Sequence, residues 1–163
     1  MRHLWFCIAL IFMAGPAVAL SCLRPDVARS FHRADAAPET YLVVHGKLGF
    51  DESLLPERNL RSWQGAPAET LVPAVLKGKS LSKAGFETDF DRQITLKVQC
   101  FGPWCGGAVS GIDYLAFVEN DSGDFFLTLG PCGGFDFPRP DAEMLETVLR
   151  CFRGGRCEPA KRP

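Results

Sequence analysis

The sequence predicts a mainly β domain that is cross-linked by disulfides and carries one helix at each end. Three observations lead to this prediction. Segments rich in β-branched and aromatic residues recur along the middle of the chain, and one of them alternates regularly between apolar and polar residues. Helical patterns precede and follow these segments. An even number of cysteines, six, lies downstream of residue 19.

The first 19 residues have the parts of a secretory signal. Arg2 precedes an apolar run over Leu4–Ala14, and Ala17-Val18-Ala19 offers small residues where a signal peptidase cuts. The run is shorter than the roughly 20 apolar residues that span a bilayer. A buried core helix would carry polar residues on its outer face, and this run has none. We therefore predict a signal peptide over 1–19 and a secreted or periplasmic product.

A second cut, after Ser21, would make Cys22 the first residue and open it to lipid modification. Ala19 does not match the branched residue that is usual three positions before a lipidated cysteine. We expect cleavage after Ala19, which leaves one domain over 20–152 and a short flexible tail over 153–163. No membrane association is expected unless Cys22 carries a lipid.

The first structural element of the mature chain is a short helix that begins near Pro25. Val27, Phe31 and Ala34 recur at helical spacing, and proline suits the first turn of a helix.

Five strands are predicted next. Gly46 within the first strand predicts a bulge or a tight bend, and Pro73 weakens or bulges the second. The third is the clearest, because its alternating pattern buries one face and exposes the other. Asn, Asp, Ser and Gly between the last two are typical of a hairpin turn. The five strands cover residues 41–48, 70–76, 93–100, 113–118 and 125–129.

Two irregular segments separate the strands. Residues 51–69 are polar and interrupted by prolines, which predicts a long loop of the kind that is functional or disordered. Residues 101–111 form a glycine-rich turn.

A final helix is predicted over 142–151. Asp141 is an N-cap residue, acidic side chains follow it, and Arg150 lies near the C-terminal end, where the helix dipole favours a cation. A short helix, five antiparallel strands and a closing helix form the pattern of a five-stranded OB-type barrel. A small β-sandwich is the main alternative.

The six mature cysteines predict a disulfide framework, because an even number in an oxidising compartment is typical of one; sequence leaves 15 pairings open. A metal site would need close Cys-x-x-Cys pairs, and none occurs. Two of the six have four residues between them, not the two of a redox-active pair, so we interpret that bridge as structural. The six are Cys22, Cys100, Cys105, Cys132, Cys151 and Cys157.

The charge of the chain does not indicate nucleic acid as a partner. The net charge is −1, and removal of Arg2 with the signal makes it −2. Neither value favours binding to nucleic acid or to an anionic surface.

Catalytic signatures are incomplete. Gly78-Lys79-Ser80 resembles the end of a phosphate-binding loop, but Pro73 stands where that loop needs a glycine, and we interpret the segment as a turn after a strand. Ser110 is followed directly by glycine, which breaks the nucleophile-elbow spacing. Nothing pairs His32 or His45 with a serine or cysteine. We predict no catalytic residue, no metal ligand and no cofactor.

The order of features resembles the netrin-like module, the OB-type domain of the tissue inhibitors of metalloproteinases. Cys22-Leu23-Arg24-Pro25 is similar to the family's N-terminus, and Tyr41–Gly46 to the strand that follows. Cys105-Gly106, Tyr114–Phe117 and Cys132 then occur in the family's order. The similarity covers most of the mature chain.

The resemblance implies an OB-type barrel and a protease as one possible partner. Members of the family begin Cys-x-Cys, whereas Arg24 holds the place of the second cysteine here. Their inhibition uses the free amino group and carbonyl of the N-terminal cysteine to chelate the protease zinc. Cleavage after Ala19 would leave Leu20 and Ser21 ahead of Cys22 and exclude that mechanism.

We therefore predict an exported module that binds another protein. The expected binding residues are Cys22 and Leu23 in the N-terminal segment, Trp63 as an aromatic anchor in the long loop, and Trp104, for which packing over a disulfide is an alternative role. The alternatives are a cell-envelope enzyme, thiol-disulfide or hydrolytic, and a purely structural envelope component.

Overall fold

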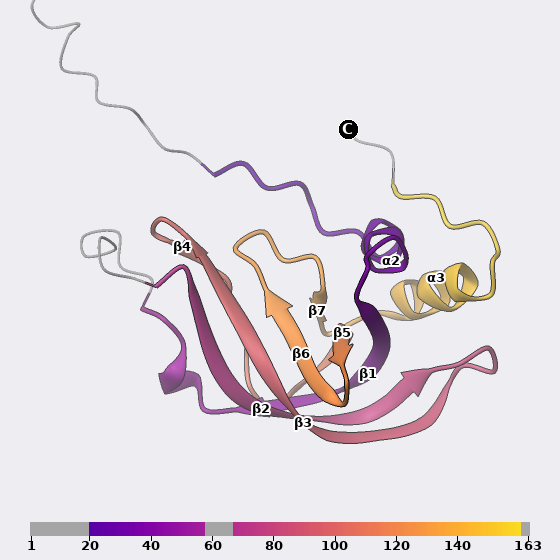
Figure 1. Cartoon of the computed structure of the whole chain (residues 1–163). Helices are drawn as coiled ribbons and strands as arrows, with labels where there is room; N and C mark the ends of the chain where they lie inside the picture. Colours follow the sequence, from indigo (N-terminus) through magenta and orange to yellow (C-terminus); the bar gives the residue numbers. More distant parts are fainter. Residues whose placement is uncertain (1–19, 58–66, 161–163) are drawn as a thin grey trace, which may run out of the picture.

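The computed structural model describes residues 20–57 and 67–160 (Figure 1). The predicted signal peptide and Trp63 lie outside the described residues. The mainly β class and the two flanking helices are confirmed. In chain order the elements are α2 (Val27–Asp35), β1 (Thr40–Phe50), the 3-10 helix η2 (Glu52–Leu54), β2 (Glu69–Leu81), β3 (Phe86–Phe101), β4 (Trp104–Cys105), β5 (Ile112–Asp121), β6 (Asp124–Leu129), β7 (Asp136–Pro138) and α3 (Ala142–Phe152).

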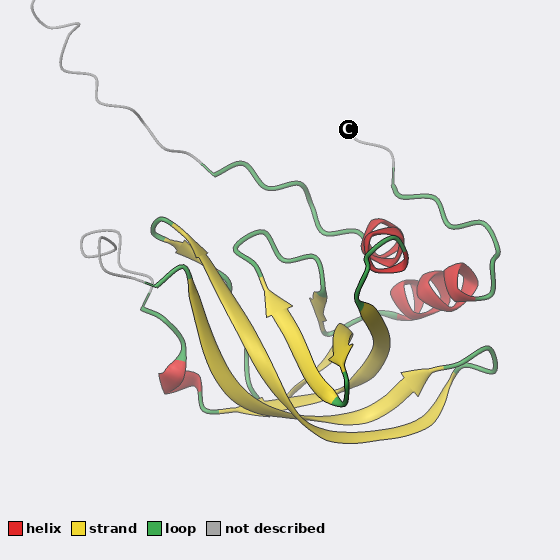
Figure 2. Ribbon diagram, in the orientation of Figure 1, coloured by secondary structure: helices red, strands yellow, loops and turns green. Residues whose placement is uncertain are grey.

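Five strands form a ring of hydrogen-bonded neighbours (Figure 2). Their order is β1-β2-β3-β6-β5, and β5 pairs back onto β1. The ring is antiparallel except where β3 and β6 run parallel, from the pair Thr95–Phe126 to the pair Val98–Leu129. The expectation of five antiparallel strands is wrong at this pair, because a ring with an odd number of strands cannot alternate in direction all the way round. Two short strands were not predicted: β4 pairs with the end of β3, and β7 pairs with β5.

Strand β5 is buried on both faces because it separates two hydrophobic cores. Tyr114, Ala116 and Val118 belong to the core inside the ring. Leu115 and Phe117 belong to a second core beneath α2 and α3, which lie side by side over this part of the sheet (Figure 1). A continuous apolar run is the pattern expected of a strand buried on both faces.

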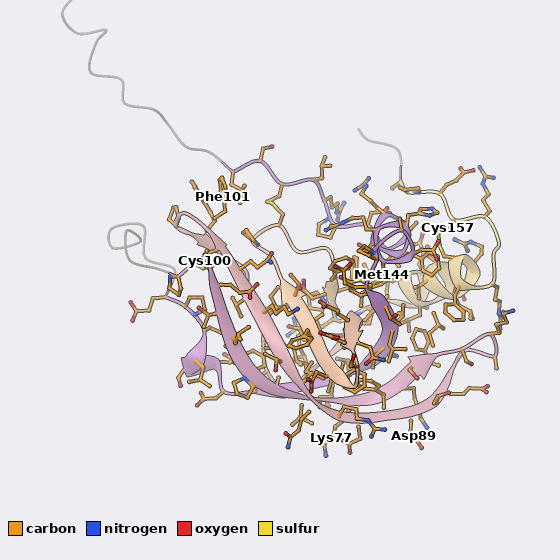
Figure 3. The ribbon with its side chains drawn as sticks, in the orientation of Figure 1. Lys77, Asp89, Cys100, Phe101, Met144 and Cys157 are labelled. Atoms are coloured by element: carbon orange, nitrogen blue, oxygen red, sulfur yellow. A yellow bond between two sulfur atoms is a disulfide. The ribbon has the colours of Figure 1, made fainter. Side chains whose placement is uncertain are left out.

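Strands β2 and β3 are longer than predicted and extend beyond the ring as a curved two-stranded ribbon (Figure 2). The expected turn at Gly78–Ser80 is wrong, because these residues continue β2 and pair with β3. Hydrophobic alternation is weak here because the outer face carries ion pairs. Lys77 Nζ lies 3.3 Å from Asp91 Oδ2, and Lys79 pairs with Asp89. The side chains of Lys77 and Asp89 point away from the ring (Figure 3).

Two facing glycines bring β1 and β2 close together. Gly46 pairs with Gly78, and the register runs through both without a shift. A Cβ atom on Gly46 would lie 2.4 Å from the Lys77 carbonyl oxygen. Gly46 therefore permits a close backbone approach, and the continuous register shows no bulge in this pairing.

Pro73 leaves the β2–β3 pairing continuous, and the register shift of β2 falls instead between Ser80 and Leu81. Pairing with β1 ends at Ala74, so Pro73 lies where one edge of β2 is open. That is the position in which a strand tolerates proline.

The helix caps and the hairpin follow the sequence signals. Asp26 Oδ1 accepts a hydrogen bond from Arg29 N, and Asp141 Oδ1 from Met144 N, both at 2.8 Å. Ser122 and Gly123 form the turn between β5 and β6 with φ values of 54° and 103°, which small turn residues adopt at least cost.

All six cysteines of the described residues form disulfides: Cys22–Cys132, Cys100–Cys105 and Cys151–Cys157. The predicted disulfide framework is confirmed and fits an oxidising compartment. Residues 153–160, which the sequence assigns to a tail, contact α2. His32 Nε2 lies 2.7 Å from the Cys157 carbonyl oxygen, and Ala160 N donates to Asp26 Oδ2 at 3.0 Å. Within the described part of the chain, no helix combines the length and apolarity needed to cross a membrane.

Candidate protein-binding surface

The N-terminal segment is fastened to the loop between β6 and β7. Cys22, just ahead of α2, is bonded to Cys132, and their Cα atoms lie 5.2 Å apart. The side chain of Pro25 lies against Gly133, where an added Cβ would be 3.4 Å from Pro25 Cγ. The segment 20–26 is therefore held at a fixed position against the loop between β6 and β7.

A second disulfide braces a short hairpin at the end of β3. Cys100 and Cys105 are directly opposite each other in the β3–β4 pair, with Cα atoms 3.9 Å apart. Gly102 has a φ of 57° and makes the turn between them. Phe101 projects from this hairpin and is 62% exposed (Figure 3).

The two disulfide-braced segments lie at the same end of the sheet. Gly106, next to Cys105, packs directly against the end of β6, because a Cβ there would lie 1.9 Å from the Leu129 carbonyl oxygen. Leu129 is three residues before Cys132. The start of β2 lies here too, since Cys100 N donates to the Ala68 carbonyl at 2.8 Å. We call residues 20–26, 67–71, 99–106 and 129–134 the cystine end.

Large apolar side chains are most exposed at the cystine end. Phe101, Leu71 and Leu23 are 62%, 59% and 57% exposed, the highest values for large hydrophobic residues in the described ranges. Leu71 lies on β2 opposite Lys97 of β3. Each of the three belongs to a segment held by a strand pair or a disulfide, so the apolar surface is presented on fixed backbone.

The structure brings together three of the four predicted binding residues. Cys22, Leu23 and Trp104 all lie at the cystine end, Cys22 as a disulfide partner and Trp104 as a partly buried member of β4. Trp63 lies outside the described residues. Sequence reasoning missed Phe101 and Leu71. The signal for Phe101 was an aromatic residue between a cysteine and a glycine at the end of a strand.

A buried carboxyl oxygen belongs to Asp136, on the strand β7 that follows the loop carrying Cys132. Asp136 on β7 pairs with Ala116, and its Oδ1 is fully buried without a hydrogen-bond partner in the described residues, although the residue as a whole is only partly buried. Burial raises the pKa of Asp136 to about 7, and a hydrogen bond with its own backbone opposes that rise. The group is thus poised to change charge near neutral pH.

The catalytic candidates from the sequence have structural contacts. His45 packs edge-on against Phe86, with ring centroids 5.7 Å apart. The hydroxyl of Ser110 accepts a hydrogen bond from Phe50 N at 2.9 Å, and Ser110 N donates to Glu52 Oε1 at 2.6 Å. The described residues contain no group of three or more His, Cys, Asp or Glu side chains arranged to hold a metal ion.

Comparisons of the chain with protein-family models, with curated proteins and with solved structures find no match.

Proposed function

We propose that the ring is a netrin-like barrel of the OB type. Strands β1, β2 and β3 are consecutive and antiparallel, and β5 returns after a long connection to lie beside β1. This order supports the proposal, because the OB fold is a five-stranded Greek-key barrel and a Greek key places its fourth strand beside its first. The core inside the ring is apolar, as a filled small barrel requires.

We propose further that the protein is exported and binds another protein through the cystine end. The observation that carries this proposal is the gathering of Leu23, Leu71 and Phe101, each more than half exposed, on segments braced by disulfides or strand pairing. Exposed apolar side chains that gather in one region are typical of interaction sites. Fixed backbone lowers the entropy that binding costs, and an aromatic side chain such as Phe101 suits an anchor.

Site-specific crosslinking tests the binding surface. A photo-reactive amino acid at position 101 or 23 is expected to crosslink one protein in the exported fraction, and that protein should then bind the purified domain directly. The double variant Leu23→Ser/Phe101→Ser should lose this binding. Leu54→Ser is the matched control, because Leu54 is 49% exposed on η2 and lies outside the cystine end. Equal loss in the control would contradict the assignment of the surface.

Protease inhibition through the N-terminus is a narrower form of this function. The intact mass of the mature protein identifies its first residue and so decides whether zinc chelation by Cys22 is chemically feasible. Cys22 Sγ is bonded to Cys132, so only the amino group and carbonyl of Cys22 remain for zinc. A mature chain that starts at Cys22 with a free amino group would justify assays against zinc proteases. A chain that starts at Leu20 would exclude chelation and leave the cystine end as the binding surface.

A further inference from the structure

A small pocket lies where the C-terminal ends of α2 and α3 meet β1, and it is formed by residues other than those of the cystine end. Its volume is about 280 Å³, which is below the range of roughly 300–1,000 Å³ typical of drug-sized ligands and suits a single chemical group. Four aromatic side chains line it: Phe31 from α2, Tyr41 from β1, Phe117 from β5 and Phe152 from the last turn of α3. Phe117 is fully buried and Phe152 is 40% exposed, so the aromatic lining runs from the core to the surface.

Two carboxylates line the same pocket. Asp35 is the last residue of α2, and Glu39 lies just before β1. Neither belongs to an ion pair among the described residues, and no Lys, Arg or His lines the pocket. The nearest arginine of α2, Arg33, instead lies over the ring of Phe135, at 4.7 Å from its centroid.

The backbone adds to the negative electrostatic potential that the two carboxylates create in the pocket. Both helices end at the pocket, and a helix C-terminus carries a partial negative charge that favours cations. Tyr41 reports the same environment: burial raises the pKa of its hydroxyl, and the carboxylates of Glu119 and Glu39 raise it further, against the opposing effect of Arg33. Four aromatic side chains, two carboxylates that form no ion pair within the described residues, and two helix C-termini therefore converge on one small cavity.

We propose that this pocket binds a methylated ammonium group of a small organic cation. The faces of aromatic rings attract such cations, and cages of aromatic residues are a common way to hold quaternary ammonium. The carboxylates supply the counter-charge. A bare Ca²⁺ or Mg²⁺ ion fits less well, because it needs six or more oxygen ligands around it and most of this lining is aromatic carbon.

Choline is the probe for a direct test, with its neutral carbon isostere, in which carbon replaces the nitrogen, as the control ligand. Titration followed by amide NMR is expected to give saturable shifts at residues 31–43, 117 and 152 with choline and none with the isostere. The variant Asp35→Asn/Glu39→Gln keeps the shape and the aromatic lining of the pocket but removes both counter-charges, so it should weaken choline binding about tenfold, which corresponds to about 1.4 kcal/mol.

Glu87→Gln is the matched control variant, because Glu87 is an exposed carboxylate on the β2–β3 ribbon that does not line the pocket. It should bind choline as the native protein does. Phe152→Ala should also weaken binding while leaving the fold intact, since this side chain is partly exposed. The proposal is overturned if choline shifts no resonance around the pocket, if the neutral isostere binds as tightly, or if the double carboxylate variant binds normally. None of these outcomes bears on binding at the cystine end.

Discussion

Cys22 is bonded to Cys132 across 110 residues of sequence, whereas Cys100 is bonded to Cys105 across only five. Both disulfides brace the cystine end, but they constrain the unfolded chain very differently. The first closes a loop that spans nearly the whole domain. The second closes one hairpin turn.

Removal of the long-range bridge should therefore cost more stability than removal of the hairpin bridge. Loop-closure entropy gives about 4–5 kcal/mol for Cys22→Ala/Cys132→Ala and about 2 kcal/mol for Cys100→Ala/Cys105→Ala. Urea unfolding of both double variants against the native protein measures the difference. Equal losses, or an unchanged melting temperature for the first variant, would contradict the entropic account.

Gly46→Ala should destabilise the sheet severely. The new Cβ would lie 2.4 Å from the Lys77 carbonyl oxygen and 2.8 Å from Gly78 Cα, and backbone atoms in a paired strand cannot move aside cheaply. We expect a loss of about 3 kcal/mol or more, at the upper end for overpacking. Denaturant midpoints measure it.

Gly49→Ala on the same strand is the control for that substitution. A Cβ on Gly49 meets nothing closer than the Val75 carbonyl oxygen at 3.9 Å. Alanine is the better strand residue by roughly 0.5–1 kcal/mol, so this variant should be as stable as the native protein or slightly more so. A similar loss in both variants would show that the close β1–β2 approach is not the cause.

Stability should fall as pH rises from about 4 to about 7 because of Asp136. Its folded pKa, about 7, is raised above the ordinary value of 3.8, so the folded state favours the protonated form. The stability that the protonated Asp136 contributes to the folded state is fully present below pH 3.8 and is lost by the time the pH has risen through about 7. Asp136→Asn removes the buried charge, and we expect it to stabilise the protein at pH 8 by roughly 4 kcal/mol, with little effect at pH 4. Urea unfolding at both pH values tests this; a pH-independent difference would disprove it.

Asp26 should contribute more than an ordinary helix cap. Its Oδ1 caps α2 through Arg29 N, and its Oδ2 accepts a hydrogen bond from Ala160 N at 3.0 Å. Asp26→Ala is expected to cost about 1–2 kcal/mol and to speed hydrogen exchange at residues 157–160. Asp141→Ala removes only a cap, on α3, and should cost about 1 kcal/mol without any change at those amides. Unchanged exchange in the first variant would show that Asp26 does not hold this segment.

Local signals predicted the elements that depend on local bonds. Asp141 was recognised as an N-cap because its side chain bonds to an amide three residues later, and the turn at Ser122 and Gly123 because those residue types adopt positive φ at low cost. The ribbon beyond Lys77 was missed because its charged outer face obscures the alternation of a strand. β7 was missed because three residues carry too little pattern.

The candidate binding surface was predicted only in part. Leu23 was identified through its place beside Cys22, and the structure shows it exposed. The exposure of Phe101 and Leu71 depends on which neighbours cover them, and those neighbours come from distant parts of the chain. The pocket that Phe31, Tyr41 and Phe152 line has no sequence motif, because it exists only where two helices end against a strand.

The sequence by itself determined the class of this protein: a mainly β domain, two capped helices, one well-defined hairpin and a complete set of disulfide-forming cysteines. The helices and the hairpin follow from residue types within a few positions of one another, and the disulfide set follows from the even number of cysteines after residue 19. The tertiary structure decided which cysteines pair, that β6 runs parallel to β3, and that Gly46 faces Gly78. It also decided that one carboxyl oxygen of Asp136 is buried with no hydrogen-bond partner in the described residues. Such features depend on contacts between residues far apart in the chain, which form only when the strands close into a ring.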